Sequence, residues 1–217
     1  MIHGSARPGT TRGQVLGAPY LYDLFANFFF FGRRRATFQA LIAAAGVQPG
    51  QRVLDVGCGT GYFARLLAQA AGRHGLVVGI DPSTGMISYA RRKTGRASNC
   101  QFQVGTAEAL EFPGEHFDVV VSSLVMHHLP EDLQAPALRE MRRVLRPEGT
   151  LLVAEAQNPR HGLGWRLLAR AHGYDRMARM VPDLLSLAAD AGFGEIHTSE
   201  VPPWLRYVYA VKTVRAA

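Results

Sequence analysis

The chain of 217 residues is long enough to bury one sizeable hydrophobic core, so a single globular domain is the first expectation. Hydrophobic residues make up 47% of the chain and charged residues 19%, which excludes an intrinsically disordered protein. Two cysteines, Cys58 and Cys100, cannot form a disulfide framework or a four-cysteine metal site, and they favour a reduced, cytoplasmic setting.

The net charge of +7 would suit nucleic acid, an anionic lipid surface or an acidic substrate as a partner. A general preference for arginine explains this charge equally well, because the basic residues are spread along the chain. The clusters Arg91–Lys93 and Arg142–Arg143 fall late in predicted helices, where cations interact favourably with the helix dipole. Charge alone therefore identifies no partner.

Residues 1–19 are rich in Gly, Pro, Thr and Arg and have no apolar segment, so we expect a flexible N-terminus without a signal peptide. Residues 20–217 are expected to form one domain. The longest apolar run, Leu24–Phe31, is far shorter than the roughly 20 residues that a membrane-spanning helix requires. We therefore expect no membrane span.

Helical and strand patterns alternate through the middle of the chain, which predicts a parallel sheet with helices on both faces. The apolar run Val119–Val121, for example, is typical of a strand that is buried on both sides. Helices are predicted at Ala36–Ala45, Tyr62–Ala71, Ser83–Lys93 and Glu131–Leu145. Strands are predicted at Gln51–Val56, Gly75–Ile80, Cys100–Val104, Phe117–Ser122 and Thr150–Glu155, the last after a turn at Arg146–Gly149.

The C-terminal part departs from this alternation. A helix at Pro182–Ala191, ended by Gly192, is followed by two strands at Ile196–Val201 and Leu205–Thr213. The connection between these strands contains Pro202-Pro203 and is too short for a parallel crossover, so we expect the two strands to pair antiparallel. An antiparallel hairpin would thus close the parallel sheet.

A glycine-rich motif follows the first predicted strand. In Val53–Gly61, glycines recur at alternate positions after Asp55, which lets the backbone turn tightly and approach a ligand closely. The next strand ends on Asp81, whose carboxylate can accept hydrogen bonds from two ribose hydroxyls. The two features together predict a nucleoside-binding crevice at the carboxyl edge of the sheet.

The spacing of the glycines excludes two common nucleotide motifs. A dinucleotide fingerprint would need a glycine where Tyr62 stands, and no Lys-Ser or Lys-Thr pair follows as in a P-loop. The pattern from Val53 to Gly61, with Asp81, resembles motif I and the acidic position of the class I S-adenosylmethionine-dependent methyltransferases. The resemblance extends from about Ala36 to Thr213. It implies an α/β, Rossmann-like fold with a seven-stranded, mostly parallel sheet, S-adenosyl-L-methionine as cofactor, and methyl transfer.

The resemblance also implies which residues hold the methionine part of the cofactor. Gly57, Cys58 and Gly59 would lie against it, and Asp55 would orient this turn and favour the cofactor's ammonium group. Alternatively, Asp55 only caps N–H groups of the loop. Ser123 and Leu124, which follow the fourth strand, would line the site beside the sulfonium.

The nucleoside part would be held by residues after the second and third strands, again by resemblance. Asp81 and the adjacent Pro82 would contact the ribose, although Asp81 could instead cap the helix that begins near Ser83. Met86 would pack on the adenine ring, or belong to the core. The family usually has Asp-Ala-Glu after the third strand, where this chain has Thr106, Ala107 and Glu108. The Thr106 hydroxyl is a weaker acceptor than a carboxylate, and the backbone N–H of Ala107 or Glu108 would read the ring.

Methyl transfer from a sulfonium needs alignment and exclusion of water, and neither a metal nor a nucleophilic residue. A general base matters if the acceptor is a hydroxyl, a cationic amine or an activated carbon acid. His127 and His128 are the candidates, because imidazole titrates near neutral pH and both follow the fourth strand. Alternatively, one ring bonds a backbone carbonyl and fixes the turn before Pro130.

The acceptor should be bounded by a helical cap at residues 20–46 and an insertion at residues 157–180. Within the cap, Tyr22 resembles the tyrosine that closes over the cofactor in related enzymes. The aromatic block Phe28–Phe31 beside the basic block Arg33–Arg35 suits a lipid interface, a lid over an apolar acceptor, or burial against the sheet. This segment loosely resembles the quinone C-methyltransferase and phosphatidylethanolamine N-methyltransferase group. We therefore expect a small apolar or lipid-like acceptor, such as a quinone, a phospholipid amine or a natural product, and peripheral contact with a membrane surface.

Two other functions remain open. An RNA methyltransferase would account for the positive charge, but Ser122–Val125 stands where base amino-methyltransferases usually have Asn/Asp-Pro-Pro-Tyr, so no nucleic-acid partner is expected. A cofactor-binding partner protein without transferase activity would show the same glycine turn and the same acidic residue. The sequence leaves the oligomeric state open.

Overall fold

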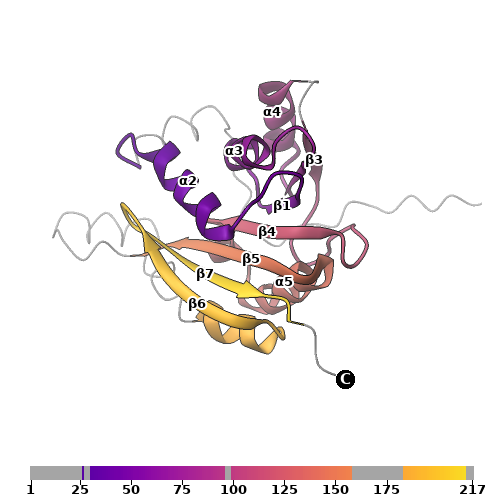
Figure 1. The fold of residues 1–217 in the computed structure, drawn as a ribbon, viewed down its shortest axis with the longest axis vertical. Helices are drawn as coiled ribbons and strands as arrows, with labels where there is room; N and C mark the ends of the chain where they lie inside the picture. The colour runs from indigo at the N-terminus through magenta and orange to yellow at the C-terminus, as the bar shows by residue number, and fades with distance from the viewer. Residues whose placement is uncertain (1–25, 27–29, 96–98, 158–182, 214–217) are drawn as a thin grey trace, which may run out of the picture.

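The computed structural model describes Ala26 and residues 30–95, 99–157 and 183–213. Its centre is a seven-stranded sheet in the order β3-β2-β1-β4-β5-β7-β6 (Figure 1). The strands are β1 (Arg52–Val56), β2 (Leu76–Asp81), β3 (Cys100–Val104), β4 (Phe117–Ser123), β5 (Leu145–Ala156), β6 (Gly194–Val201) and β7 (Leu205–Val211). The first five strands pair parallel, and β7 pairs antiparallel with both β5 and β6, which confirms the predicted fold class.

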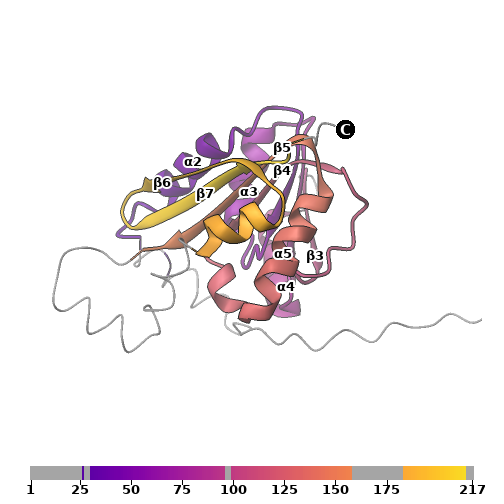
Figure 2. The ribbon, with the colours of Figure 1, turned by 90° about the horizontal axis from the view of Figure 1, so that it is seen from below.

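Helices cover both faces of the sheet (Figure 2). One face carries α2 (Arg34–Ala45), α3 (Tyr62–Ala71) and α4 (Thr84–Thr94). The other face carries α5 (Glu131–Val144) and a helix at residues 183–190. Because successive side chains of a strand point to opposite faces, each buried strand supplies both layers. Within β1, Val53 faces α3, and Leu54 belongs to the layer beneath α5.

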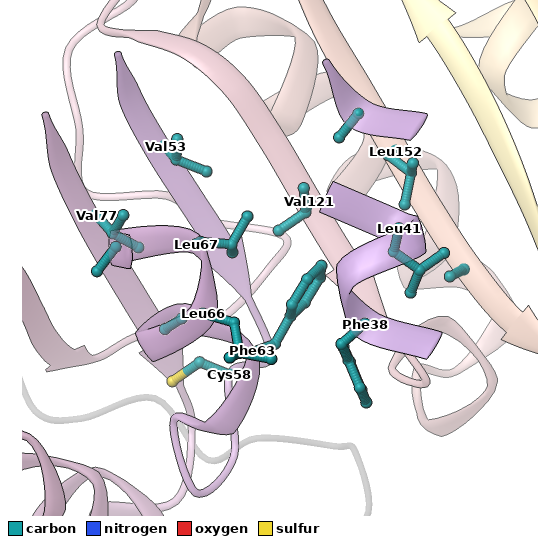
Figure 3. Close-up of a cluster of buried hydrophobic side chains, with 14 of the residues drawn as sticks. Phe38, Leu41, Val53, Cys58, Phe63, Leu66, Leu67, Val77, Val121 and Leu152 are labelled. Atoms are coloured by element: carbon teal, nitrogen blue, oxygen red, sulfur yellow. The ribbon is translucent and has the colours of Figure 1, made fainter. Parts of the chain in front are cut away.

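The layer beneath α2 and α3 is shown in Figure 3. Phe38 and Leu41 of α2 and Phe63 and Leu67 of α3 pack there against side chains of the central strands. The phenyl rings of Phe38 and Phe63 lie 4.8 Å apart between their centroids. This packing ties α2 to α3, the helix that the glycine-rich turn leads into.

The predicted elements agree with the structure within about two residues, with one exception. The segment Arg146–Gly149 was predicted as a turn, and it lies within β5, which begins at Leu145. The segment bulges, because β4 pairs Phe117 with Leu145 and Val119 with Thr150. The backbone N–H of Glu148 donates to the carbonyl of Lys212, so pairing beyond the end of β7 keeps the bulge in the sheet.

Several predictions lie outside the described residues. They concern the flexible residues 1–19, the Tyr22 lid, and most of the insertion at residues 157–180. The division into a domain at 20–217 with a cap at 20–46 therefore stays a prediction. Among the described residues, no helix is long and apolar enough to cross a membrane.

Candidate functional site

The candidate site lies at the carboxyl edge of the sheet, where the strand order reverses between β1 and β4. Such a reversal leaves a crevice, because the chain leaves the two strands in opposite directions. The turn from Gly57 to Gly61 joins β1 to α3 at this point, and all three of its glycines have positive φ. A Cβ at Gly57 would overlap the Val125 side chain, and one at Gly61 would lie 2.7 Å from the Phe102 ring.

Gly59 has a different role from its two neighbours. Its φ of 51° favours glycine, and no atom lies within 4 Å of the position that a Cβ would take. Packing therefore explains Gly57 and Gly61, whereas the space beside Gly59 is open to a ligand. Its N–H donates to Asp81 Oδ2 at 3.0 Å, which ties the turn to the end of β2.

Asp81 joins the glycine turn to the start of α4. Its Oδ1 accepts a hydrogen bond from the Ser83 N–H at 2.8 Å, while the Ser83 hydroxyl accepts from the Met86 N–H and caps the helix. The alternative role for Asp81 as helix cap is thus filled by Ser83. Burial raises the pKa of Asp81, and the hydrogen bonds from Ser83 and Gly59 counteract this shift. The Gly105 N–H donates to the Asp81 carbonyl at 3.2 Å, so the segment after β3 borders the same crevice.

Asp55, at the end of β1, is only 1% exposed. Its Oδ2 has no hydrogen-bond partner among the described residues. Burial, together with the nearby Asp81, raises the pKa of Asp55 to about 8, although a backbone hydrogen bond from Ala64 opposes the shift. A buried carboxylate oxygen without a donor is costly, and a cationic ligand would remove this cost.

A pocket opens beside Asp55 and contains a buried cation as well. Arg34 of α2 is 5% exposed, and its guanidinium lies 3.8 Å from the centroid of the Tyr62 ring. A ligand that carries an ammonium and a carboxylate group would find both counter-charges here. The residues that line the pocket are Ala26, Phe30, Arg34, Phe38, Asp55, Gly57, Cys58, Gly59, Thr60, Tyr62, Phe63, Ser123 and Leu124.

The structure therefore groups the sequence candidates into two sets. Six of them line the pocket, namely Asp55, Gly57, Cys58, Gly59, Ser123 and Leu124. The others lie at the end of β2, in the first turn of α4 or after β3, namely Asp81, Pro82, Met86, Thr106, Ala107 and Glu108. Sequence reasoning missed Arg34, because a run of three arginines does not show which one faces inward.

A second cluster joins the loop after β4 to the end of β5. Glu155 is 0% exposed, and its Oε1 accepts hydrogen bonds from the N–H groups of Val125 (3.1 Å) and Met126 (2.8 Å). Its Oε2 lies 2.7 Å from His127 Nδ1. The partner of this ring is therefore a carboxylate, where the structural alternative had expected a backbone carbonyl. Sequence reasoning missed Glu155, although a charged residue at the end of an apolar strand was a visible signal.

His128 packs against His127, with 3.9 Å between the ring centroids and an angle of 43° between the ring planes. Burial, and then the neighbouring His127, lower the pKa of His128 to about 4. His128 is therefore neutral at physiological pH, and a group with so low a pKa is a weak base, which leaves His127 as the candidate.

Comparison with known proteins agrees with this geometry. Residues 53–149 match the family described as a methyltransferase domain. The chain is 32% identical over 200 residues to the ubiquinone/menaquinone biosynthesis C-methyltransferase UbiE of Shewanella oneidensis, with 81% of the chain and 79% of that relative covered. The chain belongs to the class I S-adenosylmethionine-dependent methyltransferases.

Solved structures show the same fold. A SAM-dependent methyltransferase from Aquifex aeolicus superposes with a TM-score of 0.70 at 20% identity, covering 91% of this chain and all of that one. The phosphoethanolamine N-methyltransferase 2 of Haemonchus contortus, solved with S-adenosyl-L-methionine, superposes with a TM-score of 0.67 at 19% identity. The alignment covers 82% of this chain and 52% of that one.

The residues at the site fit S-adenosylmethionine, the cofactor of this enzyme class. When bound, this cofactor supplies a methyl group activated by a sulfonium. The unpartnered Asp55 Oδ2 and the buried Arg34 match the two charges of its amino-acid end. The carboxylate of Asp81, at the end of the next strand, is suited to the ribose hydroxyls.

Proposed function

We propose that the enzyme transfers the methyl group to a ring carbon of an apolar, hydroxylated aromatic acceptor of the quinol type. One observation carries the proposal: polar and aromatic residues line the same pocket. Asp55, the glycine turn and Ser123 form the polar part of the lining. The aromatic part consists of Phe30, Phe38, Tyr62 and Phe63. The names of the UbiE relatives support an acceptor of the same chemistry.

The aromatic part of the lining has a clear physical role in this proposal. Phe30 is buried between Phe38 and Trp204, with ring centroids 5.6 Å and 4.7 Å away. Such a cluster would exclude water from the methyl group and hold a flat ring against the polar part of the lining. Alignment of two reactants in this way can contribute ~7–11 kcal/mol to lowering the barrier.

Peripheral contact with a membrane belongs to the same proposal. Phe31 is 67% exposed and precedes Arg33 and Arg35, which are also exposed. An exposed aromatic residue beside two cations suits an anionic lipid surface, where a prenylated ring would be dissolved.

The test is a transfer assay with S-adenosylmethionine labelled in the methyl group. A 1,4-naphthoquinol with a short prenyl chain should gain the label on a ring carbon, and anionic vesicles that carry this quinol should give a higher rate than neutral vesicles. Label found only on phosphatidylethanolamine or on RNA would refute the quinol acceptor. No transfer to any of these acceptors, with cofactor binding intact, would favour the partner-protein alternative. Equal rates in both vesicle types would count against the membrane contact.

A further inference from the structure

The Glu155 carboxylate fixes which nitrogen of His127 carries the proton. Its Oε1 is occupied by two backbone N–H groups, which can only donate. Its Oε2 is left to accept from His127 Nδ1 at 2.7 Å. In a neutral imidazole the other nitrogen is then the acceptor. In this tautomer Nε2 of His127 is the nitrogen that carries the lone pair.

His127 follows closely in the chain on residues that line the cofactor pocket. Ser123 and Leu124 line that pocket, and Val125 packs against Gly57 of the glycine turn. The short helix Met126–His128 follows at once. The Leu124 N–H also donates to the Ala154 carbonyl at 2.8 Å, which fixes the loop to β5. The His127 side chain remains 11% exposed.

We propose that His127 is the base that removes the hydroxyl proton of the acceptor, and that Glu155 is the residue that positions it. This inference rests on the quinol-type acceptor proposed above, and it selects one histidine of the pair. A hydroxylated ring becomes a stronger carbon nucleophile when its hydroxyl is ionised, which is what a base at this place would achieve.

The hydroxyl proton of the acceptor moves to His127 Nε2, and the ring's electron pair forms a bond from carbon to the methyl group. The carbon–sulfur bond breaks, and its electron pair stays on sulfur. The hydrogen on the methylated carbon then moves as a proton to the ring oxygen, which restores the aromatic ring and the hydroxyl. His127 finally gives its proton to water.

The surrounding charges are consistent with this role. The Glu155 carboxylate from β5 faces His127 Nδ1, and His128 from the same short helix stays neutral at physiological pH. Arg206 lies opposite Glu155 on β7, where its guanidinium bonds Glu200 of β6 at 2.6 Å.

Glu155→Gln is the most informative variant, because it keeps the shape of the side chain. The amide oxygen would still accept from the two backbone N–H groups, but the amide N–H would face Nδ1. The proton of His127 would then sit on Nε2, where it blocks the base. We expect kcat with the prenylated naphthoquinol to fall by about 10²–10³, as for His127→Asn. The affinity for S-adenosylhomocysteine should stay within about threefold in both variants. His116→Asn, at the other end of β4, is the matched control and should keep the wild-type kcat.

Two readouts separate a base from a merely structural pair. A halogen-substituted naphthoquinol that is already ionised at the assay pH needs no base. With this acceptor, kcat of the variants should fall less than about tenfold below the wild-type value. Equal losses with both acceptors would overturn the proposal. ¹⁵N NMR of the imidazole should show the proton on Nδ1 in the wild type and on Nε2 in Glu155→Gln, and a wild-type proton on Nε2 would also overturn it. If the wild type methylates neither quinol, the proposed function fails, and the NMR result still decides whether Glu155 sets the tautomer.

Discussion

At the scale of single residues, Asp55 combines a cost in stability with a role in binding. Its pKa is raised from 3.8 to about 8, so between these pH values the native state keeps a proton that the unfolded state has lost. Protonation of Asp55 therefore makes its whole contribution to the free energy of unfolding below pH ~4. This contribution is lost as pH rises towards about 8, by at most about 1.4 kcal/mol per pH unit.

Asp55→Asn removes this pH dependence. We expect the variant to unfold at a higher temperature than the wild type at about pH 8, with a difference that shrinks towards about pH 4. The same variant should bind S-adenosylhomocysteine at least about tenfold more weakly, because the ligand's ammonium stabilises the ionised carboxylate of Asp55, a form that asparagine cannot adopt. Thermal unfolding at several pH values and calorimetric titration measure the two effects. A variant that is less stable than the wild type at pH 8 would contradict the assigned protonation state.

At the scale of elements, α2 brings one arginine of three into the pocket. Arg34 is buried over the Tyr62 ring, whereas Arg33 and Arg35 are exposed. We expect Arg34→Gln to weaken binding of S-adenosylhomocysteine about tenfold or more, because the ligand's carboxylate loses a charge-assisted hydrogen bond. Arg35→Gln is the matched control, with the same change of charge and little change in affinity. Similar losses in both variants, measured by calorimetry, would show that only the net charge matters.

The elements that were predicted correctly are those with local signals. Tyr62–Ala71 and Cys100–Val104 were predicted to the residue, because a glycine turn precedes the helix and polar residues flank the strand. The turn predicted at Arg146–Gly149 was wrong. Pro147 and Gly149 are local signals for a turn, but the backbone pairing with Lys212, which is far away in the sequence, keeps this segment in the sheet.

At the scale of the whole molecule, the site is assembled by the sheet from segments far apart in the chain. The glycine turn and Asp81 were predictable, since each follows a strand and carboxyl ends of parallel strands meet at one edge. The contact between Glu155 and His127 joins residues 28 positions apart and follows no local pattern. Only the pairing of β4 with β5 brings these two side chains together.

The central claim is that this edge of the sheet is the S-adenosylmethionine crevice, and calorimetric titration of Asp81→Asn with S-adenosylhomocysteine tests it most directly. The control is Asp118→Asn, the same substitution at the beginning of β4, on the edge of the sheet opposite to Asp81. We expect the wild type and the control to bind equally and Asp81→Asn to bind at least about tenfold more weakly, because it loses the carboxylate that faces the ribose. Equal affinity in all three proteins would contradict the claim.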